Sequence, residues 1–310
     1  MSTIERAIQK LGQTAPDSQD ASTRDDIPSS LTALEPNPAL LMDEPAALPE
    51  FAMNPPNDTD RDNDESASRI QMDYDYMASL GMVTPDSERN QVAEEYRHIK
   101  RPLLLNAFGE GALSNTNRNL IMVCSARPNE GKTFTAINLA LSIALERDRT
   151  VLLVDADVAK PSLARVLNFP VTAGLVDFLA DPHRRLADLI LQTNMPKLRI
   201  LPAGRRHSHS TELLASDGMQ ILAQELADRY PDRVVIFDSP PLLATSEAAV
   251  LAGLVGQVVM VVEAEKTKRE ELKEALGLLK QDQYVGLVLN KSNRPFGADY
   301  YYGSYGSYGE

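Results

Sequence analysis

A glycine-containing segment of the sequence has the residue types of a phosphate-binding loop. The segment ARPNEGKT, 126–133, matches the pattern G-x-x-x-x-G-K-[ST] except that Ala126 replaces the first glycine. In such loops backbone N–H groups near the second glycine face a polyphosphate, the lysine reaches the terminal phosphates and the threonine ligates Mg²⁺. The pattern predicts a nucleotide site built from Ala126, Arg127, Pro128, Asn129, Glu130, Gly131, Lys132, Thr133 and Phe134.

Three carboxylates at the ends of two other apolar runs complete the predicted site. Asp238 ends the run RVVIFD, and Asp155 and Asp157 end the run TVLLVDAD. A P-loop needs a carboxylate on another strand to hold the metal or its water. Residues i and i+2 of a strand share a face, so Asp155 and Asp157 are both expected near the terminal phosphate. Any one of them alone could cap a helix or a turn, but the set of three favours catalysis.

Six apolar, β-branched runs predict the elements that position these side chains. The runs are continuous rather than alternating, which is typical of strands covered on both faces. Between them, segments such as FTAINLALSIALER and KREELKEALGLLKQ have the apolar stripe of a helix. The alternation predicts an α/β fold with a doubly wound, mostly parallel sheet and ligands at the carboxyl ends of its strands. The expected strands are 120–124, 150–157, 198–201, 233–238, 258–263 and 285–290.

The acidic charge is concentrated ahead of this predicted fold. The net charge is −13, and residues 1–90 carry 18 Asp/Glu against 6 Lys/Arg, which leaves −1 for the rest. Such a segment cannot offset its ordering entropy by burial, so residues 13–85 are expected to be a disordered, proline-rich tether. Residues 1–12, MSTIERAIQKLG, have the capping box and apolar spacing of a short amphipathic helix, which either docks on a partner or frays.

The composition also excludes several classes of protein. With Cys124 as its single cysteine, the chain has no disulfide framework and no multi-cysteine metal site. No apolar run approaches the ~18 residues of a membrane span, and the N-terminus lacks a signal peptide's apolar region. The negative charge argues against nucleic-acid binding. We therefore expect a soluble cytoplasmic protein.

The last residues of the chain, 296–310, hold five of its ten tyrosines between glycine and serine spacers. This composition predicts a flexible tail. Together with the motifs above, the sequence resembles the bacterial tyrosine kinases of capsule and exopolysaccharide synthesis, and among them the free-standing branch associated with exosortase loci. The resemblance covers roughly residues 88–310 and implies a kinase domain over 86–295. It depends on the order of PNEGKT, VLLVDADVAKPSL, GLVDFL, LPAG, TELL, VVIFDSPPLL, VGLVLNK and the tail.

The resemblance implies ATP and Mg²⁺ as cofactors and a role for each site residue. Asp155 would accept or orient the proton of the tyrosine hydroxyl, although its role and that of Asp157 are interchangeable, and Asn290 would contact the adenine. The implied catalytic residues are Lys132, Asp155, Asp157 and Asp238, and the implied metal ligands are Thr133, Asp157 and Asp238. The substrates would be tail tyrosines entering a neighbouring subunit, namely Tyr300, Tyr301, Tyr302, Tyr305 and Tyr308.

The resemblance also implies partners. Family members form rings through a Glu-x-x-Arg-x-x-Arg helix, and EEYRHIKR offers Glu94, Arg97 and Lys100, with Arg101 one place late. Lysine lacks arginine's bidentate fork, and a solvated helix face is the alternative. A membrane polysaccharide co-polymerase would act as adaptor and recruit the protein to the inner face of the plasma membrane, and a cognate tyrosine phosphatase would reverse the reaction.

Two other functions remain open at the level of sequence. One is a positioning ATPase of the ParA or MinD kind, in which a lysine follows the first P-loop position and reaches the partner's phosphate; here that position holds Arg127, without the neighbouring glycine pair. The other is a non-catalytic regulator of polysaccharide export that assembles with nucleotide. It would use the same carboxylates, with the tyrosine tail as a contact element.

Overall fold

The computed structural model describes residues 69–86, 91–109, 117–181, 183–230, 232–281 and 283–292, all within the compact unit Pro49–Glu310. The predicted helix at 1–12, most of the predicted tether and the tail at 296–310 lie outside the described residues.

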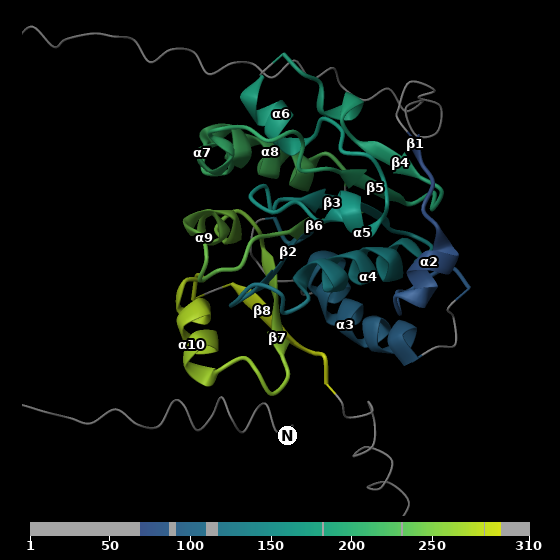
Figure 1. Cartoon of the computed structure of the whole chain (residues 1–310), viewed down its shortest axis with the longest axis vertical. Helices are drawn as coiled ribbons and strands as arrows, with labels where there is room; N and C mark the ends of the chain where they lie inside the picture. The colour runs from purple at the N-terminus through teal and green to yellow at the C-terminus, as the bar shows by residue number, and fades with distance from the viewer. Residues whose placement is uncertain are drawn as a thin grey trace, which may run out of the picture. The chain divides into compact units, whose positions relative to one another are not determined.

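The described residues form an eight-stranded sheet in the order β1-β4-β5-β3-β6-β2-β7-β8 (Figure 1). Neighbouring strands are parallel except for β4 and β5, which are antiparallel. The predicted doubly wound, mostly parallel sheet is therefore confirmed. Its strands are β1 (Arg69–Ile70), β2 (Leu120–Ser125), β3 (Thr150–Asp155), β4 (Leu191–Thr193), β5 (Leu198–Leu201), β6 (Arg233–Asp238), β7 (Gln257–Glu263) and β8 (Tyr284–Asn290).

Helices cover both faces of this sheet. Strand residues such as Ile121 and Val123 pack with α2 to α5 on one face, whereas Leu120 and Met122 pack with α6 to α10 on the other. Burial on two faces explains why the strand runs are continuously apolar. The helices are α2 (Tyr74–Ser79), α3 (Gln91–Phe108), α4 (Lys132–Ala144), α5 (Leu163–Val166), α6 (Leu175–Ala180), α7 (Ser210–Leu214), α8 (Asp217–Asp228), α9 (Ser246–Ala252) and α10 (Arg269–Gly277), with a 3₁₀ turn at Leu186–Asp188. Within the described ranges, no helix combines the length and the apolar content that a membrane crossing needs.

Two differences from the predicted elements concern the strands. The strands β1 and β4 were not predicted, because runs of two and three residues show no usable periodicity. The strand β3 ends at Asp155, two residues before the predicted end. Asp157 therefore lies in the following loop, and the expectation that it shares a strand face with Asp155 is wrong.

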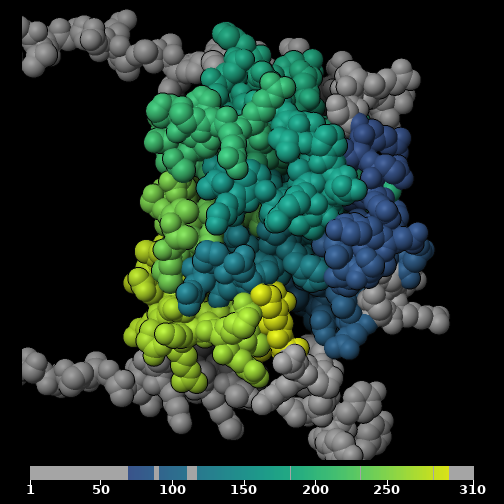
Figure 2. All heavy atoms as spheres, in the orientation of Figure 1, coloured from purple at the N-terminus to yellow at the C-terminus, as the bar shows by residue number. Residues whose placement is uncertain are grey.

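The predicted disorder of residues 13–85 is wrong for residues 69–85, which pack on the sheet and on α4. Two asparagines hold the segment: the Asn194 amide accepts from the Met72 N–H and donates to its carbonyl, and Asn138 Oδ1 accepts from Val83 N at 2.6 Å. In Figure 2 these residues, coloured purple and blue, form part of the surface against later, teal residues. The sequence did not reveal this because the contacts join positions more than fifty residues apart.

Candidate active site

The predicted phosphate-binding loop leaves β2 and ends in α4, at the carboxyl edge of the sheet. The strand β6 pairs with both β2 and β3, so Asp238 and Asp155 end strands next to the loop. Gly131 caps α4 with a φ of 99°, a left-handed conformation that favours glycine. The start of α4 presents unbonded N–H groups, which suit an anion.

Lys132, the first residue of α4, has its ammonium group at a carboxylate. Its Nζ lies 3.1 Å from Asp157 Oδ2, and the two side chains are only 12% and 7% exposed. Asp157 Oδ1 accepts a hydrogen bond from the N–H of Lys160, which fixes the loop after β3. The structure thus brings Asp157 to the phosphate-binding lysine, although by a loop rather than by the predicted strand.

The hydroxyl of Thr133 lies between the loop and the end of β6. Its Oγ1 donates to Asp238 Oδ2 at 2.7 Å and lies 2.9 Å from Ser162 Oγ. The sequence did not single out Ser162. The residue lies within the motif VLLVDADVAKPSL, but the motif assigned no role to this serine.

Asp155 and Asp238 form a buried pair of like charges. They are register partners in β3 and β6 and are both almost fully buried. Burial raises the pKa of each carboxyl well above its usual range, and the Asp155 charge raises the pKa of Asp238 further. Asp155 Oδ2 accepts N–H groups of Ser162 and Leu163, both at 3.1 Å, which lowers its pKa in part.

These groups fit a hydrated Mg²⁺ ion. The Oδ1 atoms of Asp155 and Asp238 are buried without a hydrogen-bond partner, and the Thr133 hydroxyl lies against the same pair. A cation would compensate the two facing charges. No cluster of three or more His, Cys, Asp or Glu side chains suited to a metal occurs in the described part of the chain. Mg²⁺ binds through one or two carboxylates and otherwise uses phosphate and water.

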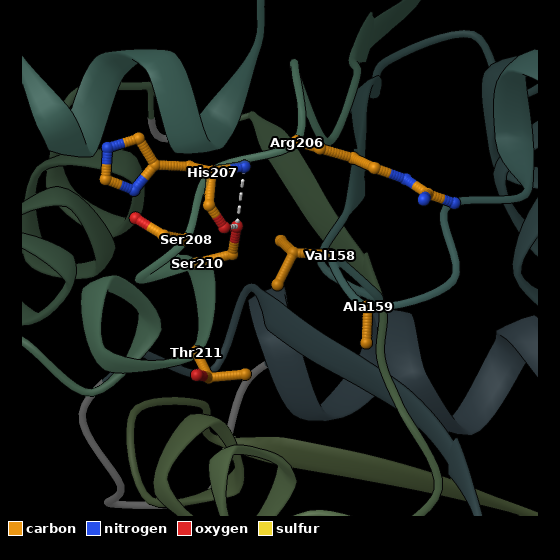
Figure 3. Close-up of a pocket in the computed structure, with 7 residues that line it drawn as sticks. All are labelled: Val158, Ala159, Arg206, His207, Ser208, Ser210 and Thr211. Carbon is orange, nitrogen blue, oxygen red and sulfur yellow. Dashed lines mark hydrogen bonds between the residues drawn. The ribbon is translucent and has the colours of Figure 1, made fainter.

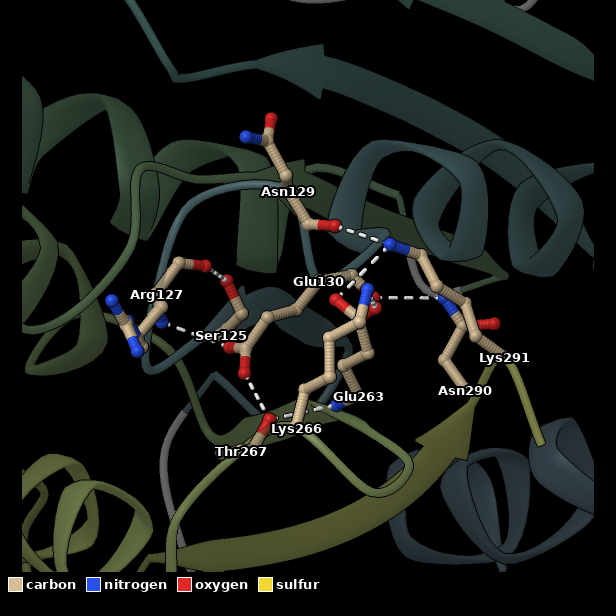
Figure 4. Close-up of polar contacts among 9 residues, drawn as sticks. All are labelled: Ser125, Arg127, Asn129, Glu130, Glu263, Lys266, Thr267, Asn290 and Lys291. Carbon is tan, nitrogen blue, oxygen red and sulfur yellow. Dashed lines mark hydrogen bonds and ion pairs between the residues drawn. The ribbon is translucent and has the colours of Figure 1, made fainter.

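Glu130 is the one acidic residue of the loop, and two hydrogen bonds hold its carboxylate in place. Its side chain is buried and accepts hydrogen bonds from the N–H of Arg127 at 2.8 Å and from the hydroxyl of Thr267 (Figure 4). The guanidinium of Arg127 pairs with Glu271 of α10 at 3.2 Å. The loop is therefore fastened to α10 and to the loop before it.

Asn290, at the end of β8, lies directly against the loop. Its Nδ2 donates to the carbonyl of Glu130 at 2.8 Å, and a Cβ added to Gly131 would lie 2.0 Å from that nitrogen. The predicted contact of Asn290 with adenine stays a prediction, and the structure adds a bond to the loop's backbone.

A pocket adjoins the loop that carries Asp157. Its volume is about 270 Å³, and Figure 3 shows Val158 and Ala159 on one side with the segment before and into α7 on the other. The sequence did not assign the residues of the second side to the site, although Thr211 begins the motif TELL. They are Arg206, His207, Ser208, Ser210 and Thr211.

The predicted oligomer contact on α3 needs a correction at one residue. Glu94 and Arg97 form an ion pair at partly exposed positions, as a surface contact requires. Lys100, however, is buried: its Nζ donates to the Ser142 carbonyl of α4 and pairs with Glu146, both at 2.7 Å. Residues 100 and 101 both lie about one turn after Arg97, and of the two only Arg101 is exposed.

Replacement of Lys100 by methionine is expected to lower the free energy of unfolding by about 1–3 kcal/mol, because the bonds that join α3 to α4 are lost. Urea denaturation followed by circular dichroism measures the change. Arg101→Ala is expected to leave the denaturation midpoint unchanged and to reduce the oligomer mass in light scattering. The opposite pattern, with oligomer loss in Lys100→Met alone, would contradict this assignment.

Comparisons with known proteins agree with this geometry. The model of the AAA domain matches residues 119–284. Over 229 residues the chain is 32% identical to tyrosine-protein kinase YwqD of Bacillus subtilis, covering 73% of this chain and 91% of YwqD. It is 30% identical to tyrosine-protein kinase CpsD of Streptococcus agalactiae, covering 76% of this chain and 97% of CpsD. The solved kinase domain of Escherichia coli tyrosine kinase ETK matches 66% of this chain and 77% of that domain, with a TM-score of 0.59 and 28% identity.

Proposed function

The chain belongs to the bacterial tyrosine-protein kinases, and from this membership we propose that it is an autokinase that transfers the γ-phosphate of ATP to the tyrosines of its tail. The observation that supports this most strongly is the convergence of Lys132 with Asp157 and of Thr133 with Asp238 at one edge of the sheet. This is the set that a P-loop phosphoryl transfer requires.

In the proposed mechanism the chain's own residues position the reactants and handle the proton. Lys132 binds the terminal phosphates, and the Thr133 hydroxyl with Asp157 and Asp238 holds the metal and its water. When bound, Mg²⁺ neutralises charge on the phosphate oxygens. The tyrosine oxygen bonds to the γ-phosphorus, the bond from that phosphorus to the β-bridging oxygen breaks, and the hydroxyl proton passes to Asp155. The raised pKa of Asp155 makes it a better base near neutral pH.

The pocket beside Asp157 offers an approach for the acceptor tyrosine. Hydroxyls of Ser208, Ser210 and Thr211 and the charge of Arg206 suit a polar, weakly acidic peptide. The tail has this character, with Asp299 and Glu310 around its tyrosines. We propose that it enters from a neighbouring subunit in a homo-oligomer that uses Glu94, Arg97 and Arg101.

The proposal extends to cellular context. CapB, CpsD and EpsB relatives carry the names of tyrosine-protein kinases, and the resemblance of the sequence is to those of capsule and exopolysaccharide synthesis. We propose that the chain regulates such synthesis and export, that it works at the inner face of the plasma membrane through a membrane adaptor, and that a tyrosine phosphatase resets it.

Intact-mass spectrometry after incubation with Mg-ATP tests whether the chain phosphorylates its tail and whether the transfer occurs between subunits. One variant, Lys132→Met, keeps the tail but loses the phosphate-binding amine. A second, with Phe at the five tail tyrosines, keeps the site but lacks the acceptors. Neither alone should gain phosphate on its tail. When the two are mixed, the Lys132→Met chain should gain up to five phosphates, since transfer occurs between subunits.

Two outcomes would overturn parts of this proposal. Phosphate on wild type but none in the mixture would show transfer within one chain. ATP hydrolysis by wild type without any gain of phosphate, even with an adaptor's cytoplasmic segment present, would favour the assembly ATPase. Equal melting temperatures of the two variants and wild type serve as the folding control.

A further inference from the structure

Two consecutive carbonyls of the phosphate-binding loop accept hydrogen bonds from two consecutive residues at the end of β8. Lys291 Nζ donates to the Asn129 carbonyl at 2.7 Å, and Asn290 Nδ2 donates to the Glu130 carbonyl at 2.8 Å (Figure 4). The segments belong to the motifs PNEGKT and VGLVLNK and lie about 160 residues apart.

The planarity of the peptide unit turns these two bonds into a constraint on the N–H groups of the loop. In a trans peptide the C=O and the following N–H point in opposite directions, and the described residues contain no cis bond. A carbonyl of Asn129 that faces Lys291 therefore turns the N–H of Glu130 to the other side. A carbonyl of Glu130 that faces Asn290 does the same for the N–H of Gly131. N–H groups at these positions are the ones a polyphosphate binds.

The donors are themselves held in place. Glu263, at the end of β7, pairs with Lys291 at 3.1 Å and also with Lys266. Asn290 is the register partner of Glu263, and its carbonyl accepts from the N–H of Ala264 at 2.9 Å. Lys291 has a φ of 57° and Asn129 a φ of 68°, so both sides of the contact use left-handed backbone. Such conformations persist where surrounding contacts determine them.

We propose that Lys291 and Asn290 are positioning residues that fix the orientation of two peptide units in the phosphate-binding loop, so that the loop's N–H groups are set for phosphate before it binds. Loss of either donor allows those peptide units to rotate. Phosphate binding must then order them, and this ordering free energy weakens the affinity for phosphate. This inference concerns the phosphate-binding loop of the proposed function. The two positioning residues lie within ten positions of the first tail tyrosine, Tyr300.

The decisive experiment uses the full chain and magnesium tripolyphosphate, a probe without adenine. Lys291→Met is expected to bind it about tenfold more weakly in calorimetry, since one charge-assisted hydrogen bond is lost. Lys291→Arg should retain most of the affinity. Asn290→Asp places a carboxylate against the Glu130 carbonyl and should weaken binding at least as much. In nucleotide-free protein, the amide NMR signals of Glu130 and Gly131 should shift in both weakened variants.

Lys280→Met is the matched control. The Nζ of Lys280 also donates to a backbone carbonyl, that of Gly253 at 2.8 Å, but remote from the loop. The Lys280→Met variant should bind magnesium tripolyphosphate with the affinity of wild type. Unchanged tripolyphosphate affinity in Lys291→Met and Asn290→Asp, with weaker ATP binding only in the second, would overturn the inference and leave Asn290 as an adenine contact. If wild type binds tripolyphosphate tightly but gains no phosphate on its tail from Mg-ATP, the kinase proposal is wrong, whereas the role of Lys291 and Asn290 in the loop is unaffected.

Discussion

An Asp238→Asn variant is expected to lose phosphoryl transfer by roughly a hundredfold to a thousandfold, and in the absence of nucleotide to melt above wild type. The loss follows because Asp238 holds the Thr133 hydroxyl and supplies a buried carboxylate for the metal. Asparagine retains an oxygen for Thr133 but carries no charge for Mg²⁺. The gain in stability follows because burial disfavours the charged form of Asp238, and the charge of Asp155 disfavours it further.

The stability gain has a defined pH dependence. The folded-state pKa values of Asp155 and Asp238 are raised, chiefly by burial. Their contribution is fully present below the unfolded pKa of about 3.9, falls as the pH rises from there, and is lost once the pH has passed the raised folded values. The wild-type protein without nucleotide should therefore lose stability progressively from about pH 4 up to the raised folded pKa values, and the Asp238→Asn variant should lose less.

Thermal melts of both proteins at about pH 6 and about pH 8.5 measure this effect, and we expect a difference of roughly 2–8 °C at the higher pH. Mg-ATP should stabilise wild type more at the higher pH, because metal and protons compete for the same oxygens. Identical pH profiles for the two proteins would show that the carboxylates do not interact as described. Single-turnover phosphate gain, followed by mass, measures the loss of transfer.

Among the glycines of the described residues, Gly174→Ala is expected to be the most destabilising methyl addition, by about 3 kcal/mol or more. A Cβ at Gly174 would lie 2.1 Å from the Pro202 carbonyl oxygen and 2.7 Å from the N–H nitrogen of Gly204. The clash is with backbone that cannot rotate away. It also breaks the contact that joins the motifs GLVDFL and LPAG, where Leu175 N donates to that same carbonyl at 2.8 Å.

This junction also holds the segment that leads to the pocket. Asp177 Oδ2 accepts the N–H groups of Gly174 and Arg205, both at 2.9 Å, and Arg205 precedes the segment that lines the pocket. We expect the melting temperature of Gly174→Ala to fall by about 6–12 °C in circular dichroism. Gly277→Ala is the control, because nothing lies within 4 Å of its added Cβ, and alanine favours the helix. Equal melting temperatures of Gly174→Ala and Gly277→Ala would show that the backbone around Gly174 accommodates the added methyl group without loss of stability.

The sequence by itself determined the fold class, the six long strands and the phosphate-binding loop of this protein. It also determined that Lys132, Thr133, Asp155 and Asp238 belong to one site. These features have local signals. A continuous apolar run indicates a strand buried on both faces, and a P-loop pattern between such a strand and a helix indicates phosphate binding. Parallel strands then place their carboxyl ends at a common edge, so their final residues meet.

Only the tertiary structure decided the features that depend on distant partners. It packed residues 69–86 on the sheet, buried Lys100 against Glu146, and brought Lys291 to the Asn129 carbonyl. A lysine has the same sequence signature whether its ammonium group lies in water, in an ion pair or on a backbone carbonyl. Which of these it contacts follows from strand order and helix rotation, and these are set by the packing of the whole domain rather than by neighbouring residues.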